Sequence, residues 1–397
     1  MPRSSSERIV VLGGGAAGMF AAITCAELAP HKEVIVLEKG PQLLAKVRIS
    51  GGGRCNVTYA CFDPREFCTR YPRGERELIG PMHRFQAKDT VEWFEHRGVK
   101  LKTEADGRMF PVTDQSGTII DCLVSAARNA GVKLFTNRGV LGIDRTPNGF
   151  RIKTHDDTMD CGKLLLATGG TRTPAMGDFA RLLGHSLEPP VPSLFTFHIE
   201  EAWVRELAGV SVPGVELSVP GTNLREQGPL LFTHWGLSGP VVLRLSAWGA
   251  RELHAKDYKF PLRIAWTSSA EIKRSASLVV NSPVGGLPKR LWAVLVNLAG
   301  IPPNERWANL SKAVQVRLEA QLHSTELQVS GKSLNKDEFV TCGGVRLPEI
   351  NFKTMQSRIC SGLYFAGELL DIDGITGGFN FQAAWTTGWI AGNAMAL

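Results

Sequence analysis

The sequence predicts an α/β fold built on a mostly parallel sheet and interrupted by an inserted part with antiparallel β and helical character. Three observations predict it. The first 38 residues contain a strand, a glycine-rich turn, a helix and a second strand; short alternating segments follow a proline-rich stretch near residue 189; and glycine-rich sequence returns after about residue 340. At 397 residues the chain is too long for one ordinary core, so we expect more than one domain.

The N-terminal segment fits a βαβ unit. Residues 7–13 (ERIVVLG) form a short β-branched run that ends in glycine, the pattern of a buried parallel strand. Residues 16–28 are rich in alanine and predict a helix that ends before Pro30. Residues 33–38 (EVIVLE) predict the second strand, and residues 163–168 (KLLLAT) a later buried strand. Strand, glycine turn, helix and strand in this order are the elements of a βαβ unit.

The turn of this unit has the GxGxxG spacing. Gly13 permits a tight turn, Gly15 lets a pyrophosphate approach the backbone, and Gly18 allows close packing of helix and strand. The N–H groups and the positive dipole end at the start of the helix then face the phosphates. Glu38, at the end of the second strand, can accept hydrogen bonds from both ribose hydroxyls of an adenosine. The unit therefore predicts a bound dinucleotide, either NAD or FAD.

Three later glycine segments favour FAD. Residues 46–58 (KVRISGGGRCNVT) form a second glycine-dense loop flanked by cations, which suits backbone that passes close to an extended charged cofactor. Residues 167–170 (ATGG) end the later strand, as the second cofactor contact of two-dinucleotide-fold flavoproteins does. Residues 362–380 lead to an apolar helix, whose positive end could lie near the flavin pyrimidine and stabilise negative charge on the reduced ring.

Five blocks of sequence carry a family resemblance. They are residues 49–58 (ISGGGRCNVT), 107–112 (GRMFPV), 230–246 (LLFTHWGLSGPVVLRLS), 341–345 (TCGGV) and 362–388 (GLYFAGELLDIDGITGGFNFQAAWTTG). In these blocks, and essentially from end to end, the chain resembles the BaiN-like NAD(P)/FAD-dependent oxidoreductases, a family of cytoplasmic bacterial flavoproteins. The resemblance implies a two-dinucleotide-binding (Rossmann-like) FAD domain of the α/β class, with an inserted β-barrel-like plus helical subdomain.

The resemblance also implies the cofactor site. By position, FAD would be contacted or enclosed by Gly13, Gly15, Gly18, Glu38, Lys46, Arg54, Asn56, Gly169, Gly367, Glu368, Asp371, Gly378 and Asn380. Their neighbours complete the expected contacts: Ala16, Ala17, Lys39, Ser50, Gly51, Gly52, Gly53, Ala167, Thr168, Gly170, Gly377 and Phe379. The chain departs from the family at Leu44 and Ala45, which replace glycine and arginine, at the shortened loop 171–185, and at Cys342, which replaces alanine. These departures concern the substrate pocket more than FAD binding.

The change of texture along the chain gives the domain boundaries. We predict the FAD-binding domain over residues 1–188 and 339–397, and the insertion over residues 189–338. Within the insertion, residues 189–268 and 323–338 are predicted to be β-barrel-like and residues 269–322 to be helical.

Composition narrows the compartment and the partners. No apolar stretch approaches the roughly 18 residues that span a bilayer, and the N-terminus lacks a signal-peptide core, so we expect a cytoplasmic protein without a membrane partner. The eight cysteines show no CxxC pair and no zinc spacing, so we expect no metal. Residues 251–319 contain eleven Lys/Arg and five Asp/Glu, a local charge of 11 − 5 = +6 within a chain of net charge +7. That segment is either an RNA-binding surface or an ordinary solvated basic face.

Catalysis by such a protein needs a reductant and a proton donor. There is no second GxGxxG, so NAD(P)H is expected to bind transiently over the flavin rather than in a fold of its own. His234 is the first candidate acid, because imidazole titrates near neutrality; it could equally pin the inserted part to the FAD domain. Cys55 is the second candidate, with a buried structural role as its alternative. Arg54 and Asn56 could orient a substrate or simply contact the cofactor.

The expected reaction is reduction of an activated C=C bond. The resemblance implies two substrate classes: uridine in large-subunit ribosomal RNA, reduced to dihydrouridine, and a small steroid-like enone. The basic segment 251–319, interleaved with Trp266, Trp292 and Trp307, favours RNA, because cations neutralise phosphate and aromatic faces stack bases. Tryptophans at helical spacing are also typical of a core, so the enone stays open. A non-catalytic flavin-binding sensor or scaffold is a third alternative.

Overall fold

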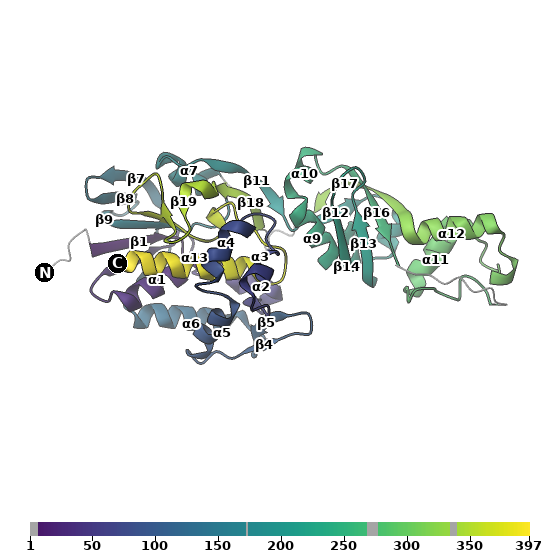
Figure 1. The fold of residues 1–397 in the computed structure, drawn as a ribbon, viewed down its shortest axis with the longest axis horizontal. Coiled ribbons are helices and arrows are strands. Elements are labelled where there is room, and N and C mark those ends of the chain that lie inside the picture. The colour runs from purple at the N-terminus through teal and green to yellow at the C-terminus, as the bar shows by residue number, and fades with distance from the viewer. Residues whose placement is uncertain (1–6, 172–173, 268–276, 334–339) are drawn as a thin grey trace. The chain divides into compact units, whose positions relative to one another are not determined.

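The computed structural model describes residues 7–171, 174–267, 277–333 and 340–397. The chain divides into two compact units (Figure 1). The sheet unit comprises Met1–Pro192 and Lys336–Leu397, and the barrel unit comprises Ser193–Asn335. The predicted boundaries, 188/189 and 338/339, lie a few residues from these divisions.

A seven-stranded sheet, in the order β19-β20-β21-β10-β1-β2-β6, forms the centre of the sheet unit. Its parallel strands are β1 (Arg8–Leu12), β2 (Glu33–Leu37), β6 (Lys133–Phe135), β10 (Lys163–Leu166) and β21 (Leu363–Phe365). Two short antiparallel strands, β19 (Ile350–Asn351) and β20 (Gln356–Ser357), extend one edge. Strands β1, β2 and β10 are almost wholly buried, as expected for apolar runs in a parallel sheet covered on both faces. The α/β class predicted from sequence is confirmed.

Two helices from opposite ends of the chain, α1 (Ala16–Leu28) and α13 (Phe379–Ala396), pack side by side (Figure 1). Glycines on α13 allow the close approach: a Cβ on Gly388 would lie 2.5 Å from the Ala17 carbonyl oxygen, and one on Gly392 2.6 Å from that of Ala21. Residues around most of each helix are buried, as expected for apolar helices enclosed in a core. Helix α1 has the bounds predicted from sequence.

Smaller elements complete the sheet unit. The helices are α2 (Ala45–Gly53), α3 (Pro64–Cys68), α4 (Glu75–Met82), α5 (Ala87–Glu95), α6 (Ser116–Asn129) and α7 (Pro174–Leu182), with the 3-10 turns η3 (Leu347–Glu349) and η4 (Gly367–Leu369). Two antiparallel sheets, β3-β5-β4 and β7-β8-β9, consist of β3 (Thr58–Tyr59), β4 (Leu101–Thr103), β5 (Arg108–Pro111), β7 (Val140–Thr146), β8 (Gly149–Thr154) and β9 (Thr158–Cys161). Strand β18 (Val340–Val345) pairs with β11 (Leu187–Ser193).

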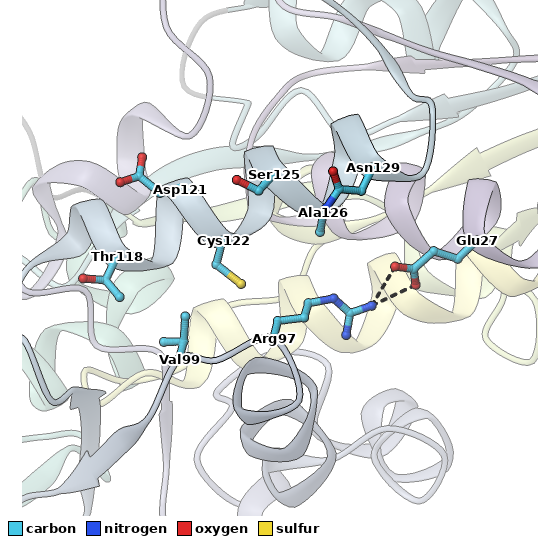
Figure 2. A pocket seen from close by; sticks show the side chains of 9 residues that line it. All are labelled: Glu27, Arg97, Val99, Thr118, Asp121, Cys122, Ser125, Ala126 and Asn129. Carbon is cyan, nitrogen blue, oxygen red and sulfur yellow. Dashed lines mark hydrogen bonds and ion pairs between the residues drawn. The ribbon is translucent and has the colours of Figure 1, made fainter.

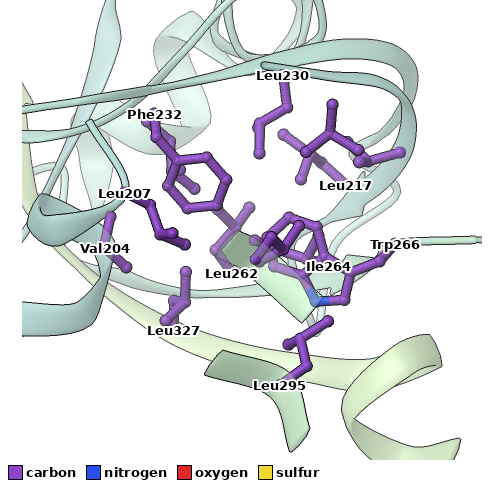
Figure 3. Packing of buried hydrophobic residues seen from close by; sticks show 14 of the residues in the cluster. Val204, Leu207, Leu217, Leu230, Phe232, Leu262, Ile264, Trp266, Leu295 and Leu327 are labelled. Carbon is purple, nitrogen blue, oxygen red and sulfur yellow. The ribbon is translucent and has the colours of Figure 1, made fainter. Parts of the chain in front are cut away.

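A closed six-stranded barrel forms the core of the barrel unit, in the order β12-β15-β14-β13-β16-β17. The strands are β12 (Thr196–Ile199), β13 (Ser211–Ser218), β14 (Arg225–Thr233), β15 (Gly236–Ser238), β16 (Phe260–Ala265) and β17 (Thr325–Ser333). Its interior is filled by side chains such as Leu217, Phe232 and Ile264, and Leu295 of α11 (Lys289–Leu298) belongs to the same cluster (Figure 3). The predicted β-barrel-like insertion is thus a true closed barrel.

The barrel unit also contains helices, which lie between its strands in the sequence. They are α8 (Ala202–Glu206), α9 (Pro240–Trp248), α10 (Ala250–Ala255), α11 (Lys289–Leu298) and α12 (Lys312–Ser324), with the 3-10 turn η2 (Trp307–Asn309). The helical prediction for residues 269–322 is too broad: residues 268–276 lie outside the described chain, and residues 277–288 form turns, because Pro283, Gly285, Gly286 and Pro288 interrupt helix formation. The end of the predicted β-barrel-like part 323–338, residues 334–338, also lies outside the described residues.

The three tryptophans of the basic segment are core residues. Trp266, Trp292 and Trp307 are 1%, 0% and 3% exposed. The indole N–H of Trp266 donates to Thr325 Oγ1 at 2.8 Å, and that of Trp292 donates to the Val279 carbonyl oxygen at 2.7 Å. The prediction that these rings stack RNA bases is therefore wrong, because no face of them reaches the surface.

In the part of the chain that the structure describes, no helix combines the length and apolarity needed to cross a bilayer.

Candidate cofactor site

The first glycine loop, between β1 and α1, combines two tightly packed glycines with one that faces open space. Gly13 has φ +108°, and a Cβ there would lie 2.3 Å from the Ala167 carbonyl oxygen; a Cβ on Gly18 would lie 2.0 Å from the Gly13 carbonyl oxygen. Gly15 differs, because a Cβ there would meet no protein atom within 4 Å. Gly15 is also the N-cap of α1 and provides no side-chain cap. The positive end of α1 therefore opens onto space of the kind that a phosphate group fills.

Glu38 stands beside this loop in a fixed orientation. Its Oε2 accepts a hydrogen bond from the Gly14 N–H at 2.8 Å, and its Oε1 accepts one from the Gly40 N–H at 2.7 Å. A carboxylate has about four lone-pair positions, so acceptor capacity is left for ribose hydroxyls. Lys39, the next residue, is exposed.

The second glycine segment is not the plain loop that its sequence predicts. Helix α2 begins at Ala45, and the chain leaves helical geometry at Ser50, Gly51 and Gly52, where φ changes from −64° to +57° and +67°. Gly53 and Cys55 also have positive φ, whereas Arg54 between them is right-handed. The prediction failed because three successive glycines argue against a helix, whereas the helical turn here ends just before them.

This segment contacts both the first loop and the segment that contains Glu368. The N–H of Leu44 donates to the Gly14 carbonyl oxygen at 2.9 Å, and Lys46 Nζ lies 2.5 Å from Glu368 Oε2. Leu44 has φ +58°, a conformation that suits the glycine expected by resemblance. Its leucine side chain is 1% exposed, so burial of that side chain offsets the backbone strain.

Arg54 is held by the protein itself. Its Nη1 lies 2.6 Å from Glu104 Oε1 and 3.4 Å from Asp114 Oδ1, and its guanidinium lies over the Phe110 ring, 4.0 Å from the centroid. These contacts attach the segment to the β3-β5-β4 sheet. Arg54 thus has a supporting role within the protein, and its contact with a substrate or cofactor stays a prediction. Asn56 is buried, and in one amide orientation it joins the Thr58 carbonyl oxygen to the Gly378 N–H.

The third segment continues from β10 beside the first loop. The Ala167 N–H donates to the Leu12 carbonyl oxygen at 2.9 Å. Gly169 has φ +82° and open space where a Cβ would lie, whereas a Cβ on Gly170 would lie 2.7 Å from Glu368 Oε1. Glu368 in turn accepts the Thr341 N–H at 3.0 Å. Thr341 is a supporting contact that reasoning on individual residues missed, although it lies in one of the blocks that carry the resemblance.

The turn before α13 completes the site. Gly367 packs against α1, because a Cβ on it would lie 2.8 Å from Ala17 Cβ. Asn380 closes the turn with two hydrogen bonds to Gly374, at 2.8 Å to its N–H and 2.9 Å to its carbonyl oxygen. Gly378 is the N-cap of α13 and supplies no side-chain cap to this second helix N-terminus. All four predicted segments thus meet at the carboxyl ends of the parallel strands, where α/β proteins bind ligands.

Asp371, before α13, and Phe379, the first residue of that helix, are buried. The Phe379 ring is 2% exposed and lies 5.0 Å from the Tyr59 ring and 4.9 Å from the Phe67 ring, so its predicted cofactor contact cannot come from the ring. Asp371 is 7% exposed, and its N–H donates to the Val345 carbonyl oxygen at 3.1 Å.

The two catalytic candidates lie in different units. Cys55 is in the sheet unit, is 0% exposed, and its burial raises the pKa of its thiol to about 12. Burial and weak acidity favour the structural role that was the alternative for Cys55, and its role as a catalytic acid stays a prediction. His234 belongs to the barrel unit, where it is exposed in the turn between β14 and β15.

We expect Cys55 to resist alkylation in the folded protein. With a pKa of about 12, on the order of one thiol in ten thousand is ionised at pH 8, and none is accessible. The partly exposed Cys61 should react first with iodoacetamide, although burial also raises the pKa of that thiol. Peptide mass spectrometry of briefly treated native protein measures both. Modification of Cys55 as fast as Cys61 would show that the loop opens.

A separate surface hollow of about 430 Å³ lies along α6 and shares no residue with the glycine segments (Figure 2). Its one cation, Arg97, is paired with Glu27 at 2.7 Å and stacked over the Trp93 ring at 3.9 Å. The hollow is lined by Glu27, Arg97, Val99, Thr118, Asp121, Cys122, Ser125, Ala126 and Asn129. Over the described ranges, no three or more His, Cys, Asp or Glu side chains gather as metal ligands.

Comparison with known proteins identifies the family of this chain and some of its relatives. The family model described as HI0933-like protein Rossmann domain matches residues 7–394. A ribosomal RNA dihydrouridine synthase of Escherichia coli (strain K12) is 32% identical over 396 residues, 96% of each chain. A 3-dehydro-bile acid delta(4,6)-reductase of Clostridium scindens is 29% identical over 408 residues, 98% of this chain and 99% of that one. The expected family resemblance is confirmed.

A solved structure supports the fold. The 3-ketosteroid-delta4-(5alpha)-dehydrogenase from Rhodococcus jostii RHA1 is similar with a TM-score of 0.53 and 14% sequence identity, over 100% of this chain and 98% of that one.

Proposed function

Because this chain belongs to the HI0933-like Rossmann-domain family, we propose that it is an FAD-dependent reductase that uses NAD(P)H to convert uridine to dihydrouridine in large-subunit ribosomal RNA. The oxidoreductase class and the FAD cofactor follow from the family. The nicotinamide reductant and the RNA substrate are the proposal. The observation that carries it is full-length similarity, at 32% identity, to a protein named for that reaction.

The residues of the sheet unit fit FAD. The N-terminus of α1 would hold the pyrophosphate, because Gly15 leaves room for it. Glu38 would accept hydrogen bonds from the ribose hydroxyls. Lys46 and Glu368, paired with each other, hold the second and fourth segments together around the cofactor. The glycine-capped N-terminus of α13 would face negative charge on the flavin.

The chemistry that FAD supplies when bound is hydride transfer from NAD(P)H to the electron-poor carbon of a C=C bond. The chain itself must supply the proton for the neighbouring carbon. We propose that a ring nitrogen of His234 donates it, because this side chain is exposed in the turn between β14 and β15 and a ring nitrogen of imidazole can carry and donate a proton.

Charge supports an RNA substrate. Residues 193–335 contain 15 Lys/Arg and 11 Asp/Glu, a net charge of 15 − 11 = +4. Lys256, Lys289 and Lys312 are exposed and form no ion pair with any residue that the structure describes, so they are available to phosphate groups. The buried tryptophans no longer contribute to this argument.

The alternative is an ene-reductase that acts on a small enone of steroid-like type. It is supported by the full-length relative named as a bile acid reductase. Both relatives are named for reactions in which a conjugated C=C bond is reduced, so the two alternatives share their flavin chemistry and differ in the acceptor.

The test is anaerobic half-reaction kinetics. The yellow holoprotein is reduced with NADH or NADPH and mixed separately with unmodified large-subunit ribosomal RNA and with a panel of enones. We expect rapid flavin oxidation with RNA, with dihydrouridine formed, and slower oxidation in a His234→Gln variant whose reduction by NAD(P)H is unchanged. Oxidation only by enones would overturn the RNA substrate, and very slow reduction by both nicotinamides would favour a redox sensor.

A further inference from the structure

The tight turn between β14 and β15 exposes the side chains of His234 and Trp235. Thr233 pairs with Gly236, so His234 and Trp235 form a two-residue hairpin turn. Two-residue hairpin turns favour asparagine, aspartate and glycine, because these residues readily adopt the positive φ that the commonest turn types require. Here a histidine and a tryptophan occupy it, and the Trp235 side chain is 40% exposed.

The backbone of this turn is pinned on both sides. The Ile199 N–H donates to the Trp235 carbonyl oxygen at 3.0 Å, and Thr233 Oγ1 donates to the Gly236 carbonyl oxygen at 3.0 Å. A Cβ on Gly236 would lie 2.2 Å from the Phe197 carbonyl oxygen, so the turn lies directly against β12. The two side chains are therefore presented from a rigid base, which lowers the entropy lost when they bind something.

Neither side chain has a partner of its own. Within residues 7–171, 174–267, 277–333 and 340–397, the structure shows no hydrogen bond or ring contact for the Trp235 indole or the His234 imidazole. By contrast, the buried Trp266 and Trp292 donate their indole N–H groups within the unit. A free indole face next to a free imidazole combines a stacking surface with a hydrogen-bonding group.

We propose that the His234–Trp235 turn binds one unstacked pyrimidine base of single-stranded RNA, with the indole against the base face and the imidazole at the base edge. The inference rests on the proposed RNA function and extends it to the residues that select the base. Stacking on exposed aromatic side chains is how proteins hold unpaired bases, and the edge of uracil offers both donors and acceptors to imidazole. The positive charge of residues 193–335 would hold the adjoining phosphates.

The experiment separates base stacking from phosphate attraction. The holoprotein is titrated with a short single-stranded oligouridylate and with an abasic strand of the same length, which has the same phosphates but no bases. Trp235→Ala should weaken oligouridylate binding by roughly 5- to 150-fold, the range for one lost base–aromatic stack, and leave abasic binding unchanged. Trp235→Phe should recover part of the loss.

Trp248 provides the matched control. It is 38% exposed at the end of α9 in the same unit, so Trp248→Ala tests whether any exposed tryptophan would do. Equal losses for both variants, or a Trp235→Ala loss on the abasic strand, would overturn the proposal. If wild-type holoprotein reduces uridine in ribosomal RNA while Trp235→Ala leaves KM unchanged, the turn is not the base site but the proposed function stands. If the wild type binds neither strand and reduces only enones, the proposed function itself fails.

Discussion

A Gly15→Ala variant is expected to fold and to purify without its yellow cofactor. In the protein, a Cβ at this position meets no atom within 4 Å, and the backbone there has φ −83°, which alanine adopts readily. The apoprotein should lose no more than about 1 kcal/mol of stability, the scale of exchanging glycine for alanine at a helix N-cap. The methyl group would instead occupy the space in front of α1 where the pyrophosphate is proposed to lie.

We expect affinity for FAD to fall by roughly 100-fold or more, about 3 kcal/mol, which is the upper range for inserting a methyl group into a filled site. Titration of apoprotein with FAD, followed by flavin absorbance, measures the affinity, and thermal unfolding of the apoprotein measures stability. Gly18→Ala is the matched control, because its Cβ would lie 2.0 Å from the Gly13 carbonyl oxygen. That variant should lose stability as well as FAD. Unchanged FAD affinity in Gly15→Ala would place the cofactor elsewhere.

The glycines of the first loop show how much of the site could be predicted from sequence. The GxGxxG spacing lies between a strand and a helix that are set by local patterns, so β1, α1 and β2 follow from residues within a short stretch. The spacing also distinguishes roles, since Gly13 and Gly18 are closely packed and Gly15 is not. The position of the other glycine segments beside this loop depends on contacts between distant residues, which only the family resemblance could imply.

Other features could not be predicted because their partners are far away in sequence. Arg54 was interpreted as a substrate or cofactor contact, but its partners Glu104 and Asp114 follow 50 and 60 residues later. The tryptophans of residues 251–319 were predicted to stack RNA bases because the segment is basic. Trp292, however, shares a buried helix face with Leu291 and Leu295. Helical spacing, the argument for a core role, was the correct signal at this position, and the local excess of cations outweighed it.

An ion pair that sequence did not reveal should dominate the stability of the site. Asp373, in the turn before α13, is 0% exposed, and Arg73 binds it through two guanidinium nitrogens, with Nε 2.5 Å from Oδ1. The backbones of the two residues also form an isolated antiparallel bridge. This contact joins the segment before α4 to the turn that contains Gly377 and Gly378.

Arg73→Ala is expected to destabilise the protein by about 3–5 kcal/mol, because the buried carboxylate of Asp373 loses its two-point contact with the guanidinium. Urea unfolding of the apoprotein measures this loss, and the double variant Arg73→Ala/Asp373→Asn should recover part of it, since the buried carboxylate charge is gone. Lys88→Ala is the matched control: its pair with Glu92 is exposed on one helix and should contribute less than about 0.5 kcal/mol.

The turn carries Gly377 and Gly378, which are predicted to contact FAD, so the loss of stability and the loss of FAD affinity should be linked. If the ion pair holds Gly377 and Gly378 in their left-handed conformations, Arg73→Ala will also weaken FAD binding, and the double variant will restore stability better than affinity. A carboxamide removes the buried charge but keeps only part of the hydrogen bonding that orients the turn. Equal recovery of both quantities would mean that the pair stabilises the unit as a whole without shaping the flavin end of α13.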